Sequence, residues 1–397
     1  MKHVLSISTL YPNAANPRFG TFVARSLEGL ARRGGWRVTL INPIGLPPVV
    51  FGKYRALSEL EELSVEEGIT IHRPRFTLIP KVGARRNAAA IAKAVLPLAR
   101  KIHAQQPVDV VDAEFFFPDG PAAAEVAGTL DLPLSIKARG SDITYWGGQD
   151  FALEQMLAAA GQASGLLAVS EALKAEMVGL GFPEDRISVH YTGLDRNRFR
   201  PLDHTQLRSQ IGKELGFDLP DTAPLLVCVG ALIERKGQDR IIAALPDIAG
   251  AQLVLVGKGE DEGKFRALAR DCGVAERVHF AGALDHNLLP LLLSAADVMV
   301  LPTENEGLAN AWVEALACGT PVVTTDVGGA RELILSKVAG RLLAERTPQA
   351  VAEAVNSVLN NPPPREAVAA FAARFDWESH AEELAAHFER LAGSGES

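Results

Sequence analysis

Two glutamates, Glu306 and Glu314, lie eight positions apart in the segment Pro302–Val323, which has the sequence PTENEGLANAWVEALACGTPVV. We expect a strand to end at Pro302 and a helix to begin near Leu308. The free N–H groups and positive dipole of that helix end suit a phosphate. Eight residues span about 12 Å of helix axis, more than the roughly 5–9.5 Å between glycosidase carboxylates. Because carboxylates only accept hydrogen bonds, the pair suits hydroxyl groups on two parts of one elongated ligand.

Two adjacent cations, Arg235 and Lys236, form a second candidate site in the segment VGALIERKG, residues 229–237. They follow a predicted strand, so they lie at the carboxyl edge of a sheet, where open α/β sheets bind ligands. Two fixed cations there would hold a diphosphate and stabilise it further as it leaves and gains charge. Taken alone, such a dipeptide is more often a solvated basic turn.

Two acids of the first half also follow predicted strands. Glu114 comes after the run 108–111, and Asp142 stands in a glycine–serine turn after the run 134–137. Each could accept a hydrogen bond from a hydroxyl at the strand edge. Glu114 could equally be a simple loop acid, and Asp142 could cap the next helix.

The elements that position these residues alternate between short apolar runs and helical segments, joined by turns rich in glycine and proline. This alternation is typical of parallel sheets with helices on both faces. The strands that we expect are 3–8, 36–41, 108–111, 134–137, 165–169, 225–229, 252–256, 278–280, 298–301 and 321–324. The helices that we expect are 22–33, 240–245, 264–271, 287–293, 309–317, 349–359 and 378–391.

Two such units follow one another in 397 residues, which agrees with the usual length of two domains. We predict an α/β fold with an N-terminal domain over residues 1–200 and a C-terminal domain over 201–375. The final helix falls within residues 376–397. The segment 195–224, rich in charge and proline, is expected to connect the domains.

The composition excludes several classes of protein. Hydrophobic residues make up 47% and the net charge is −8, which favours a globular protein and disfavours a nucleic-acid binder. The three cysteines have no paired spacing and the nine histidines no metal-binding spacing, so we expect a reducing compartment and no metal site. The apolar N-terminal stretch is too short for a signal sequence, and we therefore expect a cytoplasmic protein.

Fingerprints of other nucleotide-binding enzymes are missing from the sequence. The first predicted strand is followed by TLYPNAANPRFG rather than G-x-G-x-x-G, which disfavours a dinucleotide oxidoreductase. A phosphate-binding G-x-x-x-x-G-K-[ST] motif and a metal-binding D-x-D motif are also missing. The acidic run 260–262 opens a helix, where negative charge complements the dipole.

A basic segment at 84–104 carries Arg86, Lys93 and Arg100 at seven-residue intervals, with apolar residues on a separate face. Such a helix could lie on anionic lipid, or it could be an ordinary surface helix packed on the sheet. Pro97 predicts a kink or a break within it.

Several segments together resemble the family 4 (group 1) glycosyltransferases with the GT-B fold. The spacing of Glu306 and Glu314 matches the E-x7-E pattern of that family, and GALIERKG resembles its phosphate-binding turn. The segments 169–172 and 192–201 resemble its interdomain markers. The segments 11–23 and 139–143 resemble members that build bacterial surface polysaccharides. The match covers nearly the whole chain.

The resemblance implies two Rossmann-like, doubly wound parallel-sheet domains that face each other across a cleft, with the donor held by the C-terminal domain. Arg235 and Lys236 would neutralise the donor diphosphate. Glu306 would hold sugar hydroxyls beside the anomeric carbon, and Glu314 would hold the ribose. The other donor contacts that it implies are Gly20 from across the cleft, Gly230, Gly307, the N–H groups of Leu308, Ala309 and Asn310, and Ala283 and Leu284 beside the base.

The sequence departs from the family in one place. Many members carry H-x-H after the strand that precedes Asp112, and here Glu114 takes the place of the second histidine. A carboxylate accepts a proton or a hydrogen bond but supplies no cation, so acceptor chemistry shifts to Glu114 or to the leaving phosphate. Arg139 and Asp142 are the remaining acceptor-binding candidates.

We therefore predict a retaining, metal-independent glycosyltransferase without a cofactor. It would move a hexose from a UDP- or GDP-sugar to a polysaccharide or lipid-linked acceptor, with peripheral contact to the inner face of an anionic membrane. Two alternatives remain open, a nucleotide-sugar epimerase or hydrolase of the same fold and a catalytically silent nucleotide-sugar-binding protein.

Overall fold

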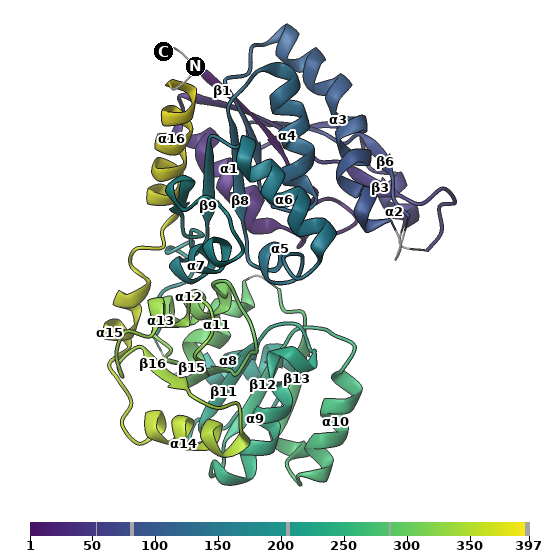
Figure 1. The fold of residues 1–397 in the computed structure, drawn as a ribbon. Coiled ribbons are helices and arrows are strands. Elements are labelled where there is room, and N and C mark those ends of the chain that lie inside the picture. Colours follow the sequence, from purple (N-terminus) through teal and green to yellow (C-terminus); the bar gives the residue numbers. More distant parts are fainter. Residues whose placement is uncertain (53, 80–82, 204–206, 286, 394–397) are drawn as a thin grey trace. The chain divides into compact units, whose positions relative to one another are not determined.

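The computed structural model of this chain describes residues 1–52, 54–79, 83–203, 207–285 and 287–393. The chain divides into two compact units (Figure 1). Unit 1 contains Met1–Gly193 and Trp377–Ser397, and unit 2 contains Leu194–Asp376. The chain therefore passes into unit 2 after Gly193 rather than after residue 200, and it returns to unit 1 at Trp377.

Unit 1 is built on an eight-stranded sheet in the order β10-β9-β8-β7-β1-β2-β5-β4. Every neighbouring pair is parallel except the edge pair β4–β5, which is antiparallel. The chain order reverses between β1 and β7, which makes this the topological switch point of the sheet. The strands are β1 (Lys2–Ile7), β2 (Trp36–Ile41), β4 (Leu63–Glu66), β5 (Ile69–His72), β7 (Val110–Ala113), β8 (Leu134–Ala138), β9 (Gly165–Ala168) and β10 (Ile187–Val189).

Helices cover both faces of this sheet, because successive strand residues point to opposite sides. Val4 joins the core under α1 and α16, and its neighbour Leu5 joins the core under α3, α4 and α6. A separate parallel pair, β3 (Ile44–Leu46) and β6 (Arg75–Thr77), precedes α3. The helices are α1 (Thr21–Arg33), α2 (Tyr54–Ser58), α3 (Ala84–Gln105), α4 (Asp119–Leu130), α5 (Ser141–Thr144), α6 (Asp150–Gln162), α7 (Glu171–Gly179), η1 (Glu184–Arg186) and α16 (Trp377–Gly393).

Helix α16, the last helix of the chain, packs on α1 (Figure 1). Buried polar side chains of α16 bond to several elements of unit 1. His380 Nδ1 donates to the carbonyl of Tyr191 at 2.7 Å, which leaves its Nε2 to accept from Ser26 at 2.7 Å. The ring of His380 stacks on His190 with centroids 4.1 Å apart, and His387 contacts Ser135 Oγ at 3.1 Å. These contacts make the last helix an integral part of unit 1.

Unit 2 is built on a six-stranded parallel sheet in the order β13-β12-β11-β14-β15-β16. Numbered within the unit, this is the 3-2-1-4-5-6 order of a Rossmann fold, and its switch point lies between β11 and β14. The strands are β11 (Leu225–Val229), β12 (Gln252–Val256), β13 (Val278–Gly282), β14 (Val298–Leu301), β15 (Val322–Thr325) and β16 (Gly340–Leu343).

The helices of unit 2 form two groups, with α9 packed on α10 and α14, and α11 on α8 and α12. The predicted connection 195–224 is wrong in part, because it contains α8, whose Leu207 and Ile211 are buried in the unit. The helices are α8 (Leu207–Leu215), η2 (Glu234–Lys236), α9 (Gln238–Ala244), η3 (Leu245–Asp247), α10 (Glu262–Asp271), η4 (Ala275–Arg277), α11 (Leu288–Ala295), α12 (Asn310–Ala317), α13 (Ala330–Leu333), α14 (Pro348–Leu359), α15 (Arg365–Ala369) and η5 (Ala370–Ala372).

Helix α3 packs on the sheet, as the second of the two interpretations of segment 84–104 expected. Its apolar residues Ile91, Val95 and Ile102 are buried in the core against the sheet. The helix is a single element that runs through Pro97, whose side chain lies on the exposed face. Among the described residues, no helix combines the length and the apolar character needed to cross a membrane.

Candidate functional site

The two chemistry-bearing stretches of unit 2 follow the two strands that flank its switch point. Strands β11 and β14 pair in register, with Leu226 beside Val298 and Val227 beside Met299. The turn η2 follows β11, and the loop 302–309 follows β14 before α12 begins. Because both strands are parallel, both connections emerge at the same carboxyl edge, where Rossmann folds bind their ligands.

Side chains of the basic turn contact the acidic loop directly. The ammonium of Lys236 forms an ion pair with Glu306 Oε1, and the two side chains are only 14% and 15% exposed. Arg235 Nη1 donates to the carbonyl of Asn305 at 2.5 Å, and the carbonyl of Arg235 accepts from Glu304 N at 2.9 Å. Residues about seventy positions apart thus form one site, and the basic turn is not merely a solvated one.

A tight backbone approach fixes the position of Glu306 from the other side. Gly328 has a φ of 51°, and a Cβ there would lie 1.7 Å from the carbonyl oxygen of Glu306. The neighbouring Gly329 N donates to the carbonyl of Gly307 at 2.7 Å. Only glycine allows the turn after β15 to pack this closely on the acidic loop. The sequence analysis did not single out Gly328.

Helix α12 begins later than predicted, at Asn310 rather than near Leu308, and Ala309 is its extended N-cap. The chain between Glu306 and Ala309 is therefore loop, and Gly328 packs on the carbonyls of its first two residues. Within the part of the chain that the structure describes, the N–H groups of Leu308, Ala309 and Asn310 have no backbone acceptor. These unpaired donors at the positive end of a helix suit an anion.

Glu314 lies one further turn into α12, and its carboxylate has no hydrogen-bond or ion-pair partner among the described residues. Burial raises the pKa of this carboxyl to about 7, and the nearby Arg198 opposes the shift. Glu314 is half-buried, and a largely desolvated acid without a partner is costly for the protein to hold. Such a group is typical of a ligand-binding position.

We expect Glu314 to weaken the fold as the pH rises. Its folded pKa of about 7 lies above its ordinary value of 4.5, so its protonated form stabilises the fold below pH 4.5 and this stability is lost as the pH approaches 7. Relative to Glu314→Gln, the wild type should lose up to about 3 kcal/mol of unfolding free energy over that range. Urea denaturation of both proteins at pH 5 and pH 8 measures the difference, and parallel pH dependences would contradict it.

The remaining donor-side candidates lie along the same edge. Gly230 follows β11, and its N–H donates to the carbonyl of Val256 at 2.9 Å. Ala283 and Leu284 follow β13, and the carbonyl of Gly282 accepts from Gly257 N at 2.8 Å. Ala283 is exposed and Leu284 is half-buried. The structure therefore places all predicted donor residues of unit 2 after β11, β13 or β14.

Two family descriptions match the chain in succession. The model for Glycosyltransferase Family 4 matches residues 20–198, and the model for Glycosyl transferases group 1 matches residues 216–375. TuaC of Bacillus subtilis, a glycosyltransferase named for teichuronic acid biosynthesis, is 30% identical over 89% of this chain and 88% of its own length. The chain belongs to the group 1 glycosyltransferases of family 4.

Other relatives of this glycosyltransferase align over about half of each chain. A GDP-mannose-dependent phosphatidylinositol monomannoside mannosyltransferase of Mycobacterium tuberculosis is 36% identical over 42% of this chain and 45% of its own. Among solved structures, sucrose-phosphate synthase of Thermosynechococcus elongatus superposes with a TM-score of 0.79 at 20% identity, covering 99% and 100% of the chains. Anabaena HepE in complex with UDP gives 0.75 at 21%, covering 98% and 100%. These structures establish the GT-B fold.

In unit 1 of this glycosyltransferase, Glu114 and Arg139 form a buried ion pair. Glu114 follows β7 and Arg139 follows β8, and their side chains are 1% and 4% exposed. Arg139 Nε also donates to the carbonyl of Glu114 at 3.2 Å. One oxygen, Glu114 Oε1, is buried without a partner among the described residues. Glu114 is therefore more than a loop acid, because its charge is compensated and one acceptor position stays unfilled.

The carboxylate of Asp142 is not free, because both of its oxygens accept hydrogen bonds from backbone N–H groups. Its Oδ1 accepts from the N–H groups of Arg139 and Gly140 at 2.9 and 2.8 Å, and its Oδ2 accepts from Phe116 N at 2.8 Å. The side chain is fully buried, and burial raises its pKa against the opposing effect of these bonds. Asp142 does not cap the next helix, because it lies inside α5 (Ser141–Thr144), whose N-cap is Gly140. The two oxygens of Asp142 instead accept from backbone N–H groups of the preceding turn and of the loop after β7.

Gly20 stands directly before α1 with a φ of 69°. A Cβ there would lie 2.6 Å from the backbone carbon and oxygen of Leu10. The tight folding of the loop that follows β1 therefore explains within unit 1 why this position is a glycine. The approach of this loop to a phosphate stays a prediction.

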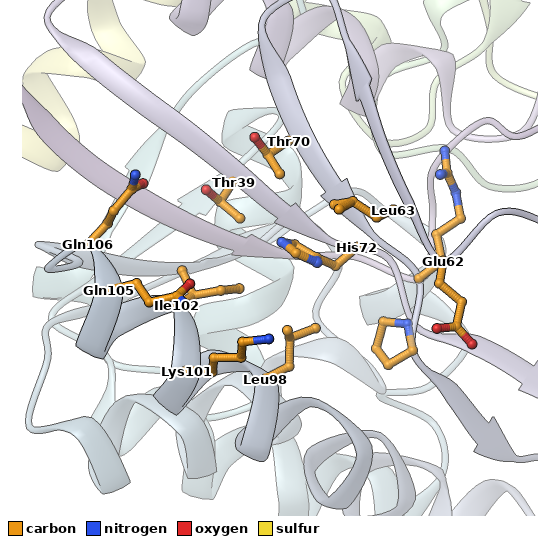
Figure 2. A pocket seen from close by; sticks show the side chains of 12 residues that line it. Thr39, Glu62, Leu63, Thr70, His72, Leu98, Lys101, Ile102, Gln105 and Gln106 are labelled. Carbon is orange, nitrogen blue, oxygen red and sulfur yellow. The ribbon is translucent and has the colours of Figure 1, made fainter.

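Two hollows of unit 1 lie apart from these residues. One, with a volume of about 560 Å³, lies between strands β2 and β5 and the C-terminal half of α3 (Figure 2). Lys101 and Leu98 of the helix face His72 of β5 there, and burial together with Lys101 lowers the pKa of His72. The other, of about 650 Å³, lies between the loop 12–17 and residues 56–66. No predicted site residue lines either hollow.

Among the described residues, no group of three or more His, Cys, Asp and Glu side chains could hold a metal ion. Cys228 and Cys318 are buried, and burial raises the pKa of each thiol to about 12, which makes them core residues rather than nucleophiles.

Proposed function

We propose that this glycosyltransferase moves a hexose from a UDP- or GDP-sugar to a saccharide or lipid-linked saccharide with retention of the anomeric configuration. The observation that carries the proposal is the contact of Lys236 with Glu306 at the switch point of unit 2. It brings a diphosphate-binding cation and a hydroxyl-binding acid to the same edge as the unpaired N–H groups before α12.

The donor diphosphate would bind the cations of the basic turn, and at Lys236 it would replace Glu306 as the anionic partner. A phosphate oxygen near Lys236 competes with Glu306 for the ammonium, because both are anionic acceptors. Arg235 adds a second charge, and the N–H groups of Leu308, Ala309 and Asn310 complete an anion site. Protein cations supply the charge compensation in this proposal, and a metal ion is not required.

Release of Lys236 leaves the carboxylate of Glu306 free to accept hydrogen bonds from sugar hydroxyls beside the anomeric carbon. The bond between that carbon and the diphosphate oxygen breaks, and a bond to the acceptor hydroxyl oxygen forms on the same face. The acceptor proton passes to the leaving diphosphate. The cations of the turn stabilise the leaving group as its negative charge grows.

The rest of the donor would lie along the carboxyl edge of the sheet. Glu314, half-buried and without a partner among the described residues, suits the ribose hydroxyls, whose hydrogen bonds would offset the cost of its desolvation. Ala283 and Leu284, after β13, suit the base. The names of relatives support either nucleotide, since HepE was solved with UDP-glucose and the mycobacterial mannosyltransferases depend on GDP-mannose.

The acceptor would meet unit 1 at the carboxyl end of β7. Glu114 Oε1 is a buried acceptor without a partner among the described residues, and a sugar hydroxyl would satisfy it. Arg139 positions Glu114 through the ion pair, and Asp142 positions Arg139 through its backbone N–H. The relatives named above suggest a surface polysaccharide or glycolipid as the acceptor, because their names refer to teichuronic acid and phosphatidylinositol mannoside.

A donor screen tests this function. Thermal unfolding is measured with UDP, GDP and ADP, and binding at a hundred times Kd should add about 2.7 kcal/mol of stability. The sugar form of the nucleotide that binds is then incubated with and without saccharide acceptors. Transfer only in the presence of acceptor supports the proposal, and release of free sugar at the same rate without acceptor would favour a hydrolase.

We also propose peripheral contact of α3 with the cytoplasmic face of an anionic membrane. Arg86, Lys93, Arg100 and Lys101 are exposed and form no ion pair with a described residue, and the large apolar residues Ile91, Val95 and Ile102 of the helix are buried. The contact would therefore be electrostatic, at about 1 kcal/mol per basic residue. Co-sedimentation with vesicles containing phosphatidylglycerol should fall several-fold in a Lys93→Glu/Arg100→Glu protein and with added salt. Equal binding to neutral phosphatidylcholine vesicles would contradict it.

A further inference from the structure

One side chain of the loop after β16, that of Arg346, contacts the candidate donor site of unit 2. Arg346, three residues beyond the end of that strand, is 20% exposed and donates to three acceptors. Its Nε donates to the carbonyl of Pro302 at 2.8 Å, and its Nη2 to the carbonyl of Arg235 at 3.2 Å. Its Nη1 contacts Glu304 Oε1 at 2.6 Å.

These acceptors belong to the two stretches that form the site. The carbonyl of Arg235 lies in the basic turn η2, and the carbonyl of Pro302 begins the loop that leads to Glu306. The guanidinium group is planar and holds its donors in a fixed fork. One rigid group therefore sets the spacing between the turn that carries Lys236 and the loop that carries Glu306.

The two stretches are also joined directly, by the ion pair of Lys236 with Glu306 and by the bond from Arg235 Nη1 to the carbonyl of Asn305, but these bonds lie within the site itself. Glu304 N donates to the same carbonyl of Arg235, and Thr303 Oγ1 reaches it at 3.4 Å, but both donors belong to the loop itself. Arg346 comes from a separate strand connection, so it anchors the turn and the loop to the sheet. The ion pair with Glu304 is a weaker element, because that side chain is 61% exposed.

We propose that Arg346 is a positioning residue that fixes the anion-binding geometry of Arg235, Lys236 and Glu306. The proposal rests on the proposed function, since it takes this site to be the donor diphosphate site. Arg346 acts through main-chain carbonyls and the acidic loop.

Binding of UDP and GDP by isothermal titration calorimetry tests the inference with the nucleotide that the wild type binds. Arg346→Ala should raise its Kd about 10- to 100-fold, because displaced cations bind the diphosphate poorly. The Kd of Arg346→Lys should lie between those of the wild type and Arg346→Ala, since lysine keeps the charge but lacks the forked donors of the guanidinium group. Guanidinium chloride at non-denaturing concentration should partly restore binding to Arg346→Ala and leave the wild type unchanged.

Arg341→Ala is the matched control. Arg341 lies in β16 and bonds Lys337 O, Gly340 O and Ser357 Oγ, none of which belongs to the site, so nucleotide binding should stay within about twofold. Thermal unfolding establishes that each variant is folded, and Arg346→Gln replaces Arg346→Ala if that variant is not. The inference would be overturned if the Arg346 variants bound the nucleotide with the wild-type Kd, or if Arg341→Ala raised the Kd as much as Arg346→Ala does. Failure of the wild type to bind either nucleotide would instead overturn the proposed function.

Discussion

Replacing Glu306 by glutamine is expected to lower kcat for sugar transfer by about two to three orders of magnitude. The side chain is 15% exposed and pairs with Lys236 at the switch point, so it stands where a diphosphate-bound sugar would lie. Glutamine keeps the size and one acceptor oxygen but loses the negative charge, which under the proposed function would stabilise positive charge developing at the anomeric carbon. Steady-state kinetics with the donor found by the nucleotide screen measure the effect.

Nucleotide binding should respond differently from turnover in this variant. Glu306→Gln removes a competitor of the phosphate for Lys236, so Kd for the nucleoside diphosphate should stay equal or fall. Glu304→Gln is the control, because this neighbouring acid has a 61% exposed side chain and an exposed pair is worth little. We expect its kcat within about threefold of the wild type. A Glu306→Gln enzyme with wild-type kcat would show that Glu306 does not act in the transfer.

Replacing Gly328 by alanine should both destabilise unit 2 and lower transfer activity. The added Cβ would lie 1.7 Å from the carbonyl oxygen of Glu306, and a φ of 51° strains any L-residue. Relief requires the acidic loop to move, which we expect to cost about 2–5 kcal/mol of stability. Displacement of Glu306 by even about 1 Å should reduce kcat/KM about a hundredfold.

Gly263→Ala provides the comparison for this change. Gly263 lies in α10, and no described atom lies within 4 Å of the position that a Cβ would take there, so alanine should keep or raise stability. Thermal unfolding and kcat/KM of the two variants are measured side by side. If Gly328→Ala matches Gly263→Ala in both, the close approach on which the site geometry depends is not important.

The central strands of unit 2, β11, β12 and β14, could be predicted well, because each is an almost continuous apolar run. Strands 225–229, 252–256 and 298–301 have the predicted bounds. The edge strands β4, β10 and β16 were missed, because their short sequences LSVE, ISV and GRLL contain polar residues or glycine and are not continuous apolar runs. Helix α8 was missed for another reason. Its charged sequence resembles a linker, and only burial of Leu207 and Ile211 reveals its packed face.

The sequence by itself determined the family of this glycosyltransferase and the residue types of its site. Motif spacing and strand–helix alternation are local properties, so the E-x7-E segment, the basic turn and the α/β class could all be recognised along the chain. The substitution of Glu114 for the family histidine was also visible in this way.

Only the tertiary structure decided which of those residues meet and what else holds them. Three interactions each join two different strand connections. They are the ion pair of Lys236 with Glu306, the ion pair of Arg139 with Glu114 and the hydrogen bond from Phe116 N to the carboxylate of Asp142. Arg346 and Gly328 belong to no sequence motif, and their positions depend on β15 pairing with β14 and β16 pairing with β15 in the sheet. Strand order brings together segments that are distant in the chain, and spacing along the sequence contains no information about that order.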